Sequence, residues 1–258
     1  MHQYAEENAK AFLEMFDLTL NHGSTVKPRG EEIKELEDFQ FSFSPYYPFM
    51  TFKKRNYDIN YFRKEMRWKL GASKYDDSIK QAAAMWESVQ NPDGTFNSNY
   101  GQFWFGEQAG FWTVWTELVR DKDSRRAVIP MLSKEHFTPQ TKDTVCTEAV
   151  GFRIRDGALN MSIHMRSSDQ IFGLGTDLPT FSFLYRLLYA VLKVNYPNLK
   201  VGLITVTAMS SHIYARHYSM VRSIVAAGDD HYEAIPMPWC SDASEAMAII
   251  SSRGKNTV

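Results

Sequence analysis

The chain has 258 residues, 44% hydrophobic and 23% charged, which is typical of a folded globular protein with one large domain or two small ones. Its net charge of −1 provides no general attraction to nucleic acid or to an anionic membrane, so anion binding would need a local basic cluster. Two cysteines are too few for a disulfide framework and fit a reducing cytosol. No apolar run approaches the roughly 20 residues of a membrane helix, and no signal-peptide pattern is found. These features predict a cytoplasmic protein.

Apolar residues at helical spacing predict helices at residues 3–20, 58–70, 78–90 and 107–120, and in an apolar segment headed by Asp177. Asp177 would be the N-cap of its helix, with Pro179 just inside. Short apolar or aromatic runs predict strands at residues 39–52, 127–132, 150–155, 158–166 and 201–206. A last helix is expected to start near Ser211, and the tail from residue 229, with Cys240, is interpreted as packing.

The Asp156-Gly157 dipeptide predicts a two-residue hairpin turn, because both central residues of such a turn adopt positive φ. Apolar and polar residues alternate on either side of it, as expected for two paired strands. With a two-residue turn, the register places Cys146 opposite Ser167 and beside Arg166. A bulge in the first strand would shift this register by one residue.

Cys146 is therefore a candidate nucleophile. A cysteine thiol has a pKa of about 8.5, so only a few per cent is thiolate at neutral pH. A guanidinium on the facing strand would stabilise the thiolate and raise that fraction. The alternative is a small buried hydrophobic residue, which is what cysteines outside disulfides usually are. The residue pattern alone leaves both interpretations open.

Four further positions have both an ordinary and a functional interpretation. Arg29 lies in a Pro/Gly-rich segment suited to a loop that closes on an anion, but it also fits a solvated surface arginine. Glu65 has apolar neighbours, and such a residue is usually a surface position on an imperfect stripe. Arg125 and Arg126 precede a strand, where solvated charges are the default interpretation.

Motifs of several other functions are missing. The Gly173-Leu174-Gly175 segment lacks the third glycine and the strand–helix context of a dinucleotide-binding fingerprint. No Walker loop, GxSxG elbow or CxxC pair occurs. His212 and His217 are five residues apart without a carboxylate at metal-ligand spacing, so no metal site is predicted.

The combination of residues resembles the thymidylate synthase superfamily. The positions at the superfamily's spacings are Cys146, Arg166, Ser167, Asp169, Gly173 and Asp177. Three short strings are similar to one branch in particular, the deoxycytidylate hydroxymethylases of phages: NSNYG at 97–101, DSRR at 123–126 and HIYARH at 212–217. The resemblance covers residues 29–217, about three-quarters of the chain.

The resemblance implies a fold and a set of partners. The fold would be one α/β (α+β) catalytic domain over residues 1–258, with a twisted mixed sheet, surrounding helices and a homodimer formed through the sheet. The substrate would be a pyrimidine nucleoside monophosphate and the co-substrate 5,10-methylenetetrahydrofolate, with no nucleic acid or membrane required. A phage-encoded protein of this kind would act in the cytoplasm of its bacterial host.

The resemblance also implies roles for individual residues. Cys146 would attack the pyrimidine, Glu65 would handle protons and water, and Asp177 would read the base edge. The phosphate would be bound by Arg29 (with Lys27 as the alternative alignment), Arg166 and Ser167, and across the dimer interface by Arg125 and Arg126. His212 and Tyr214 would hydrogen-bond the sugar 3′-hydroxyl. The folate would be bordered by Asp169, Phe172 and Gly173.

Asp177 indicates which base is read. Asparagine, which the synthases carry here, matches the acceptor O4 and donor N3 of uracil. A carboxylate instead accepts from the cytosine amino group, and a mismatched buried pair costs about 1–3 kcal/mol. The sequence therefore predicts hydroxymethylation of dCMP. The alternatives are action on CMP, action on dUMP as hydroxymethylase or synthase, and a non-catalytic protein that binds nucleotides or single-stranded nucleic acid through its aromatic residues.

Overall fold

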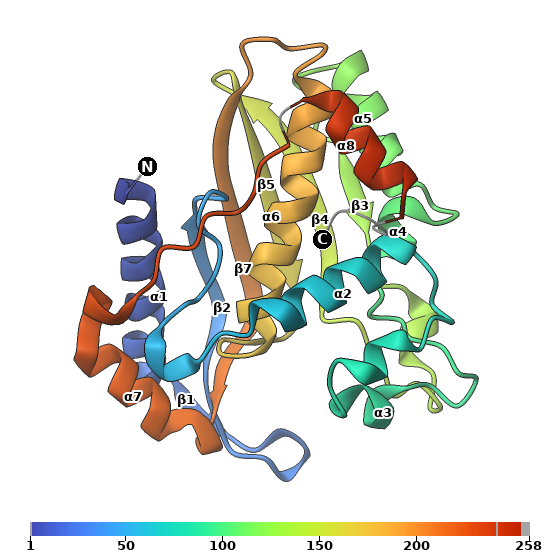
Figure 1. The fold of residues 1–258 in the computed structure, drawn as a ribbon. Coiled ribbons are helices and arrows are strands. Elements are labelled where there is room, and N and C mark those ends of the chain that lie inside the picture. The colour runs from blue at the N-terminus through green and yellow to red at the C-terminus, as the bar shows by residue number, and fades with distance from the viewer. Residues whose placement is uncertain (1, 241, 254–258) are drawn as a thin grey trace. The chain divides into compact units, whose positions relative to one another are not determined.

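A computed structural model describes residues 2–240 and 242–253 (Figure 1). The described chain divides into two compact units, each built from three separate segments. The first unit comprises residues 2–57, 164–185 and 203–238, and the second comprises residues 58–163, 186–202, 239–240 and 242–253. Neither unit is a continuous stretch of sequence, because the chain passes between them several times. The expectation of one domain over residues 1–258 stays a prediction.

Helices and strands occur in runs along the chain, with four α-helices from α2 to α5 followed by four strands from β3 to β6. The α-helices are α1 (His2–His22), α2 (Ile59–Gly71), α3 (Met85–Val89), α4 (Gly101–Phe105), α5 (Gly110–Arg120), α6 (Gly173–Leu192), α7 (Tyr218–Ala227) and α8 (Ala243–Ser251). The strands are β1 (Ser24–Val26), β2 (Ile33–Phe43), β3 (Val128–Pro130), β4 (Thr147–Arg155), β5 (Ala158–Met165), β6 (Ser168–Asp169) and β7 (Lys200–Tyr214). Short 3₁₀ turns are η1 (Pro28–Gly30), η2 (Lys53–Arg55), η3 (Ser78–Gln81), η4 (Lys134–Phe137), η5 (Ala215–His217) and η6 (Gly228–His231).

The first unit contains β1, β2, most of β7 and the short strand β6. Strand β2 pairs antiparallel with both β1 and β7, from Ile33 opposite Tyr214 to Phe43 opposite Ile204. Strand β6 runs parallel to β7, which makes the sheet mixed. Helix α1 packs on β2 and contacts α7 (Figure 1). The buried residues of α1 are spaced as one face of a helix requires: Ala5, Ala9, Phe12 and Phe16.

The second unit contains β3, β4 and most of β5, in the order β5-β4-β3. The predicted two-residue turn between β4 and β5 is confirmed, with φ of 52° at Asp156 and 73° at Gly157. Asp58 caps α2 as predicted, since its side chain accepts a hydrogen bond from the Asn60 amide at 2.8 Å. A separate core cluster consists of Trp68, Ile79, Trp86 and Phe96.

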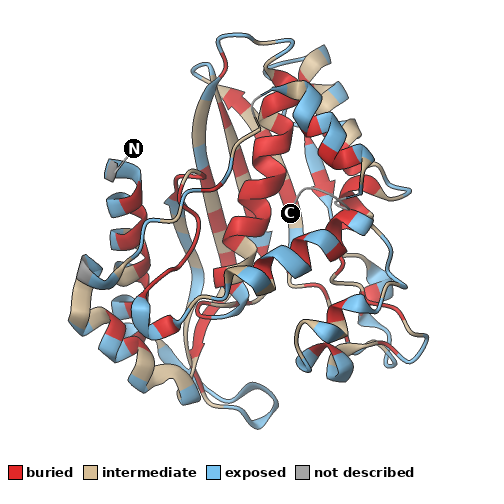
Figure 2. Ribbon diagram, viewed as in Figure 1, coloured by how far each residue is buried: buried red, intermediate tan, exposed pale blue. Residues whose placement is uncertain are grey.

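Helix α6 is buried along most of its length (Figure 2). The sequence placed its start at Asp177, and this prediction is wrong because the helix begins at Gly173. The carboxylate of Asp169 accepts hydrogen bonds from the amides of Ile171, Phe172 and Gly173, at 3.1, 3.3 and 3.4 Å. These bonds satisfy amide groups at the helix start, so the helix begins one turn earlier than expected.

Three further boundaries differ from the predictions. The helix expected at 78–90 is the 3₁₀ turn η3 followed by the five-residue helix α3. The strand expected at 39–52 is β2, which begins at Ile33 and ends at Phe43. The helix expected near Ser211 is wrong, because β7 continues to Tyr214 and the next α-helix begins at Tyr218. Pairing with β2 extends β7 to Tyr214, although the apolar run itself ends near residue 206.

The predicted fold class is confirmed: the described residues combine helices with the strands of a mixed sheet. The dimer stays a prediction. Among the helices that the structure describes, none combines the length and the apolar character needed to cross a membrane.

Gly101 should be intolerant of any side chain. A Cβ at this position would lie 1.5 Å from the carbonyl oxygen of Lys69, an atom of the backbone that cannot rotate away. We expect Gly101→Ala to lower the free energy of unfolding by about 1–3 kcal/mol or more, the cost of overpacking. In Gly71→Ala the new Cβ would make only an ordinary contact of 3.7 Å with Asp76. Urea denaturation of both variants checks the prediction, and equal stabilities would contradict it.

Candidate functional site

Cys146 lies in the bend directly before β4 and is half-buried. Its neighbour Thr147 is fully buried, and the Thr147 hydroxyl donates a hydrogen bond to the Tyr100 hydroxyl (Oγ1–Oη 3.3 Å). The strand pairing expected to reach Cys146 and Ser167 stops short of both, because β4 begins at Thr147 and β5 ends at Met165. The proximity of the Cys146 sulfur to the Arg166 guanidinium stays a prediction.

The segment before Cys146 is anchored by Asp143. One carboxylate oxygen accepts from the Ser98 amide at 2.7 Å and the other from the Ser98 hydroxyl. The Asn97 side chain donates to the Asp143 carbonyl at 2.8 Å, and Asn91 accepts from the Asp143 amide at 3.2 Å. Burial raises the pKa of Asp143, although the hydrogen bonds from Ser98 act in the opposite direction. The 97–101 string thus holds the chain three residues before the candidate nucleophile.

Glu65 lies on α2 and is buried, with only 6% of its surface exposed. Its Oε1 is 2.7 Å from the Nζ of Lys69, one helical turn further along, and Lys69 is itself 1% exposed. The Lys69 ammonium also lies over the ring of Tyr100, 4.6 Å from the ring centre. The second unit therefore connects the candidate proton-handling residue with the segment that carries Cys146. The sequence analysis missed Lys69 and Tyr100; the spacing of four residues between Glu65 and Lys69 was the available signal.

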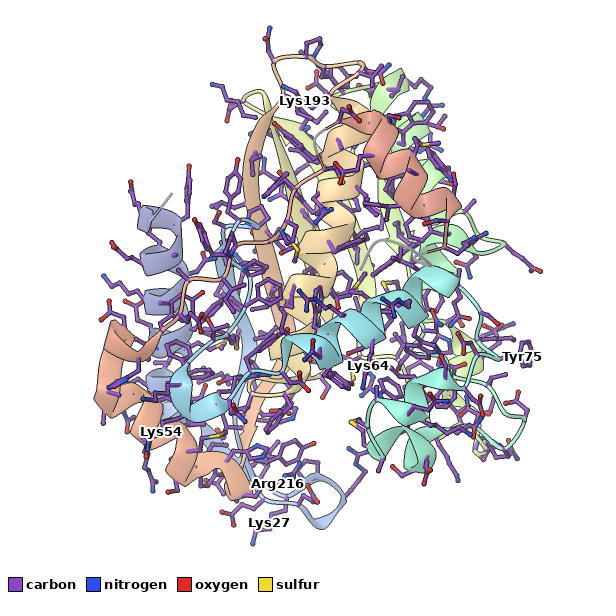
Figure 3. All side chains as sticks on the ribbon, viewed as in Figure 1. Lys27, Lys54, Lys64, Tyr75, Lys193 and Arg216 are labelled. Carbon is purple, nitrogen blue, oxygen red and sulfur yellow. The ribbon has the colours of Figure 1, made fainter. Side chains whose placement is uncertain are left out.

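The candidate phosphate-binding residues of the first unit lie in two places. Arg166 and Ser167 directly follow β5 and are half-buried. Arg29 is exposed in η1, in the loop between β1 and β2, with a φ of 53°. The same loop carries Glu31, which forms an ion pair of 2.5 Å with Arg216 (labelled in Figure 3). Arg29 is thus part of an exposed loop.

Asp169 and His212 lie next to each other, as paired residues of β6 and β7. Burial lowers the pKa of His212, an effect that the negative charge of Asp169 opposes. The ring of Tyr214 meets the His212 ring edge to face, with 5.2 Å between centres. A neutral imidazole is therefore available to donate or accept a hydrogen bond, and its tautomer sets which.

The start of α6 rests on a buried arginine that the sequence analysis missed. Arg55 is 7% exposed, and its Nε donates to the carbonyl of Ile171 at 2.9 Å. Its guanidinium lies over the rings of Tyr57 and Phe172, at 4.6 and 5.4 Å. Burial lowers the pKa of Arg55, while Tyr57 and Asp169 raise it. In the sequence, Arg55 follows two lysines and is indistinguishable from a solvated basic run.

The cofactor candidates Phe172 and Gly173 open α6. Phe172 is 49% exposed, and its ring and that of His217 meet in a T-shaped contact with 5.0 Å between ring centres. Asp177 lies in the second turn of α6 and is half-buried, so its expected role as N-cap is wrong. Arg125 and Arg126 are exposed and precede β3.

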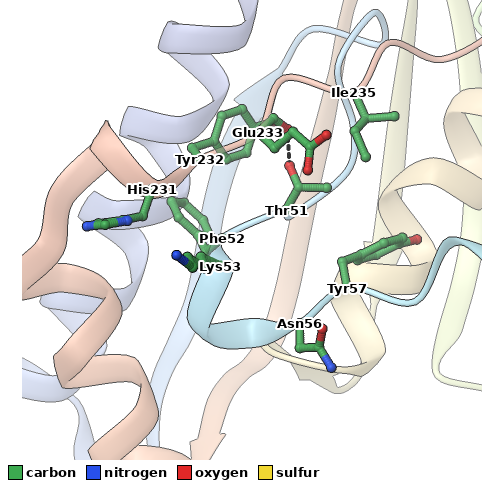
Figure 4. A pocket seen from close by; sticks show the side chains of 9 residues that line it. All are labelled: Thr51, Phe52, Lys53, Asn56, Tyr57, His231, Tyr232, Glu233 and Ile235. Carbon is green, nitrogen blue, oxygen red and sulfur yellow. Dashed lines mark hydrogen bonds between the residues drawn. The ribbon is translucent and has the colours of Figure 1, made fainter.

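A cavity of about 590 Å³ lies elsewhere in the first unit (Figure 4). Aromatic and polar side chains line it: Thr51, Phe52, Lys53, Asn56, Tyr57, His231, Tyr232, Glu233 and Ile235. None of these is a predicted site residue. Tyr57 connects the cavity with the Arg55 cluster, since the Arg55 guanidinium lies over its ring.

Comparison with known proteins shows what the chain is similar to. The family model described as "Thymidylate synthase" matches residues 10–238. The deoxycytidylate 5-hydroxymethyltransferases of Enterobacteria phages T6 and T4 are each 28% identical over 190 residues, 66% of this chain and 73% of theirs. The deoxyuridylate hydroxymethyltransferase of Bacillus phage SP01 is 26% identical over 240 residues, 80% of this chain and 57% of its own. The family match confirms the resemblance and extends it at both ends.

Asp143 should make stability depend on pH in an identifiable direction. Burial raises the pKa of Asp143 in the folded protein, so its contribution is fully present below the unfolded value of about 3.9 and is lost as pH rises through the folded pKa. Each unit of pKa difference corresponds to about 1.4 kcal/mol. The free energy of unfolding of the wild type should therefore rise relative to that of Asp143→Asn as pH falls from about 7 to about 4.

Asp93→Asn is the control, because the pKa of Asp93 is shifted in the direction opposite to that of Asp143. The Thr95 hydroxyl lowers the pKa of Asp93, so the wild type should lose stability relative to that variant as pH falls below the unfolded value of about 3.9 and through the folded pKa. Urea denaturation of the three proteins from about pH 7 to below about pH 4 measures both differences. Equal pH dependence for the two variants would contradict the prediction.

Proposed function

The chain belongs to the thymidylate synthase family, and from this premise we propose that it is a deoxycytidylate 5-hydroxymethyltransferase. It transfers a one-carbon unit from 5,10-methylenetetrahydrofolate to C5 of dCMP and adds water, giving 5-hydroxymethyl-dCMP. Similarity to the T6 and T4 enzymes supports this reaction. The observation that carries the choice of base is the carboxylate of Asp177.

Asp177 reads cytosine through the exocyclic amino group. A carboxylate only accepts hydrogen bonds, so it matches the amino group at C4 and supports a proton on N3 as charge develops in the ring. The amides at the start of α6 are satisfied by the carboxylate of Asp169, and Asp177 follows in the second turn of the helix. Uracil would place an acceptor at C4 against the carboxylate, which repels it.

Cys146 starts the reaction as a nucleophile. Its thiolate adds to C6 of the pyrimidine, and the electron pair of the C5–C6 bond makes C5 nucleophilic. C5 bonds to the one-carbon unit that the folate carries; loss of the C5 proton and cleavage of the C–N bond, whose electron pair leaves with tetrahydrofolate, then give an exocyclic methylene group. Glu65 accepts a proton from water as the water oxygen bonds to that methylene carbon. The C6–S bond then breaks, C5=C6 re-forms and Cys146 leaves as a thiolate.

The phosphate of dCMP is bound by arginines. A nucleotide phosphate carries up to two negative charges, and the planar guanidinium can bind it through two hydrogen bonds. Arg29, Arg166 and Ser167 contribute from one protomer, and the partner subunit's Arg125 and Arg126 complete the site in a homodimer. This local positive charge is needed because the whole chain carries only −1. The exposure of Arg29 in its loop suits a side chain that closes on the bound anion.

The residues proposed to bind the sugar and the folate have side chains suited to those groups. His212 and Tyr214 are adjacent aromatic donors for the 3′-hydroxyl, and burial lowers the pKa of His212 so that its ring is neutral at physiological pH. The partly exposed aromatic side chain of Phe172 fits the aromatic part of a folate, with Asp169 and Gly173 beside it. These residues bind and orient; the one-carbon chemistry belongs to the folate.

The second candidate is a deoxyuridylate hydroxymethyltransferase. Similarity to the SP01 protein over 80% of this chain favours it, although the chain spans only 57% of that protein. Action on CMP and non-catalytic nucleotide binding are the further alternatives.

Mass spectrometry of the nucleotide product tests the reaction. The chain is incubated with dCMP, dUMP or CMP and with 5,10-methylenetetrahydrofolate. We expect dCMP to gain one CH2O unit, because water completes the transfer. A gain of CH2 would indicate a synthase, and modification of dUMP alone would favour the second candidate. No change in any nucleotide would favour a binding protein and refute the proposal.

Asp177→Asn tests the choice of base. An amide matches uracil, so the preference for dCMP over dUMP should fall by about 5- to 150-fold, equivalent to the 1–3 kcal/mol of a mismatched pair. Tritium release from C5 of each nucleotide measures the preference. Asp156→Asn, the same chemical change in an exposed hairpin turn, should leave it unaltered. An unchanged preference in Asp177→Asn would refute the role of the carboxylate.

A further inference from the structure

The ion pair between Glu65 and Lys69 is unusual because both partners are buried. Their side chains are 7% and 2% exposed, and Oε1 of Glu65 lies 2.7 Å from Nζ of Lys69. Burying two charges costs desolvation free energy that their attraction does not always offset, and apolar residues of similar volume often stabilise a fold as well. Packing alone therefore does not explain why a lysine occupies this position.

Only one of the two carboxylate oxygens of Glu65 takes part in the ion pair. Its Oε1 is bound to Lys69, whereas its Oε2 is buried and has no hydrogen-bond partner among the described residues. A buried carboxylate oxygen without a donor is costly in free energy, and a ligand or a water molecule with an O–H group would relieve that cost. One oxygen of Glu65 is thus held by Lys69, and the other remains to accept a hydrogen bond.

Lys69 is held in place from several directions. The ring of Tyr100 lies under its ammonium at 4.6 Å. Next to it in the chain, the carbonyl of Trp68 accepts from the Asn99 side chain at 3.1 Å, and the Lys69 carbonyl lies against Gly101. Through Tyr100 and Thr147, the same contacts lead to the residue after Cys146. The position of the ammonium is therefore fixed relative to the segment that carries the nucleophile.

We propose that Lys69 is a positioning residue, which holds Glu65 aligned as the proton acceptor for the water that completes the transfer. This inference rests on the proposed hydroxymethyltransferase function. The ion pair holds Oε1 of Glu65 on the Lys69 ammonium, so Oε2 is the oxygen left to accept the proton.

In the water-addition step, Oε2 of Glu65 takes one proton from water while the water oxygen bonds to the exocyclic methylene carbon. The electron pair of the methylene double bond moves to C5. It then forms C5=C6 as the C6–S bond breaks and its electron pair leaves with Cys146. The proton on Glu65 returns to solvent. Lys69 neither gains nor loses a proton, so it acts only through Glu65.

The test uses Lys69→Met, Glu65→Gln and the double variant, with Lys64→Met as a matched control. Lys64 is an exposed lysine on the same helix (Figure 3). In a single turnover with dCMP tritiated at C5, Lys69→Met should release tritium at close to the wild-type rate. Its hydroxymethylated product should form about 10- to 100-fold more slowly, within the range that proton transfer contributes to catalysis. The KM for dCMP should change less than about twofold, because Lys69 does not bind the nucleotide.

The double variant separates positioning from structural damage. Because it replaces the ion pair by a neutral pair, it should melt at a higher temperature than either single variant. Its rate of product formation should equal that of Glu65→Gln alone, since Lys69 acts only through Glu65. Lys64→Met should behave like the unsubstituted chain.

Each contrary outcome has a distinct meaning. Equal slowing of tritium release and product formation in Lys69→Met would show a structural effect and overturn the inference. A further loss in the double variant beyond that of Glu65→Gln would overturn it as well. If the unsubstituted chain releases no tritium from any nucleotide, the proposed function fails and this inference fails with it.

Discussion

The structure of the second unit depends on the hydrogen bonds made by residues 97–101. Ser98 and Asn97 hold the Asp143 segment, and Asn99 holds the end of α2 through the carbonyl of Trp68. The same short string therefore fixes two elements far apart in sequence, one with Cys146 and one with Glu65. Because buried polar groups must find partners, changing one member of this network would leave others unsatisfied.

In the first unit, charged side chains fix the backbone at the start of α6. The Asp169 carboxylate accepts from the amides at the start of the helix, and Arg55 donates to the carbonyl of Ile171. Both groups are committed to the backbone, so the turn that carries Phe172 has a defined conformation. Arg55 also explains why residue 175 is a glycine, because a Cβ there would lie 2.4 Å from a nitrogen of the Arg55 guanidinium. A rigid turn with an exposed aromatic ring is suited to orienting a flat ligand.

In both units charge is concentrated locally although the chain as a whole is close to neutral. The buried groups are paired or hydrogen-bonded, as Glu65 with Lys69 and Asp143 with Ser98. Arg29, Arg125 and Arg126 are exposed, where a dianionic phosphate can reach them. This distribution supports the proposal that a nearly neutral chain binds an anionic nucleotide.

The sequence by itself determined the family, the hairpin turn at Asp156-Gly157 and the cap at Asp58, because spacing and local turn chemistry act over a few residues. It did not determine where α6 begins or how far β7 extends, because Asp169 and β2 set those limits through contacts with other segments. It also could not distinguish Arg55 and Lys69 from surface basic residues. Only tertiary structure decides burial, and burial is what turns an ordinary charged side chain into one that must have a partner.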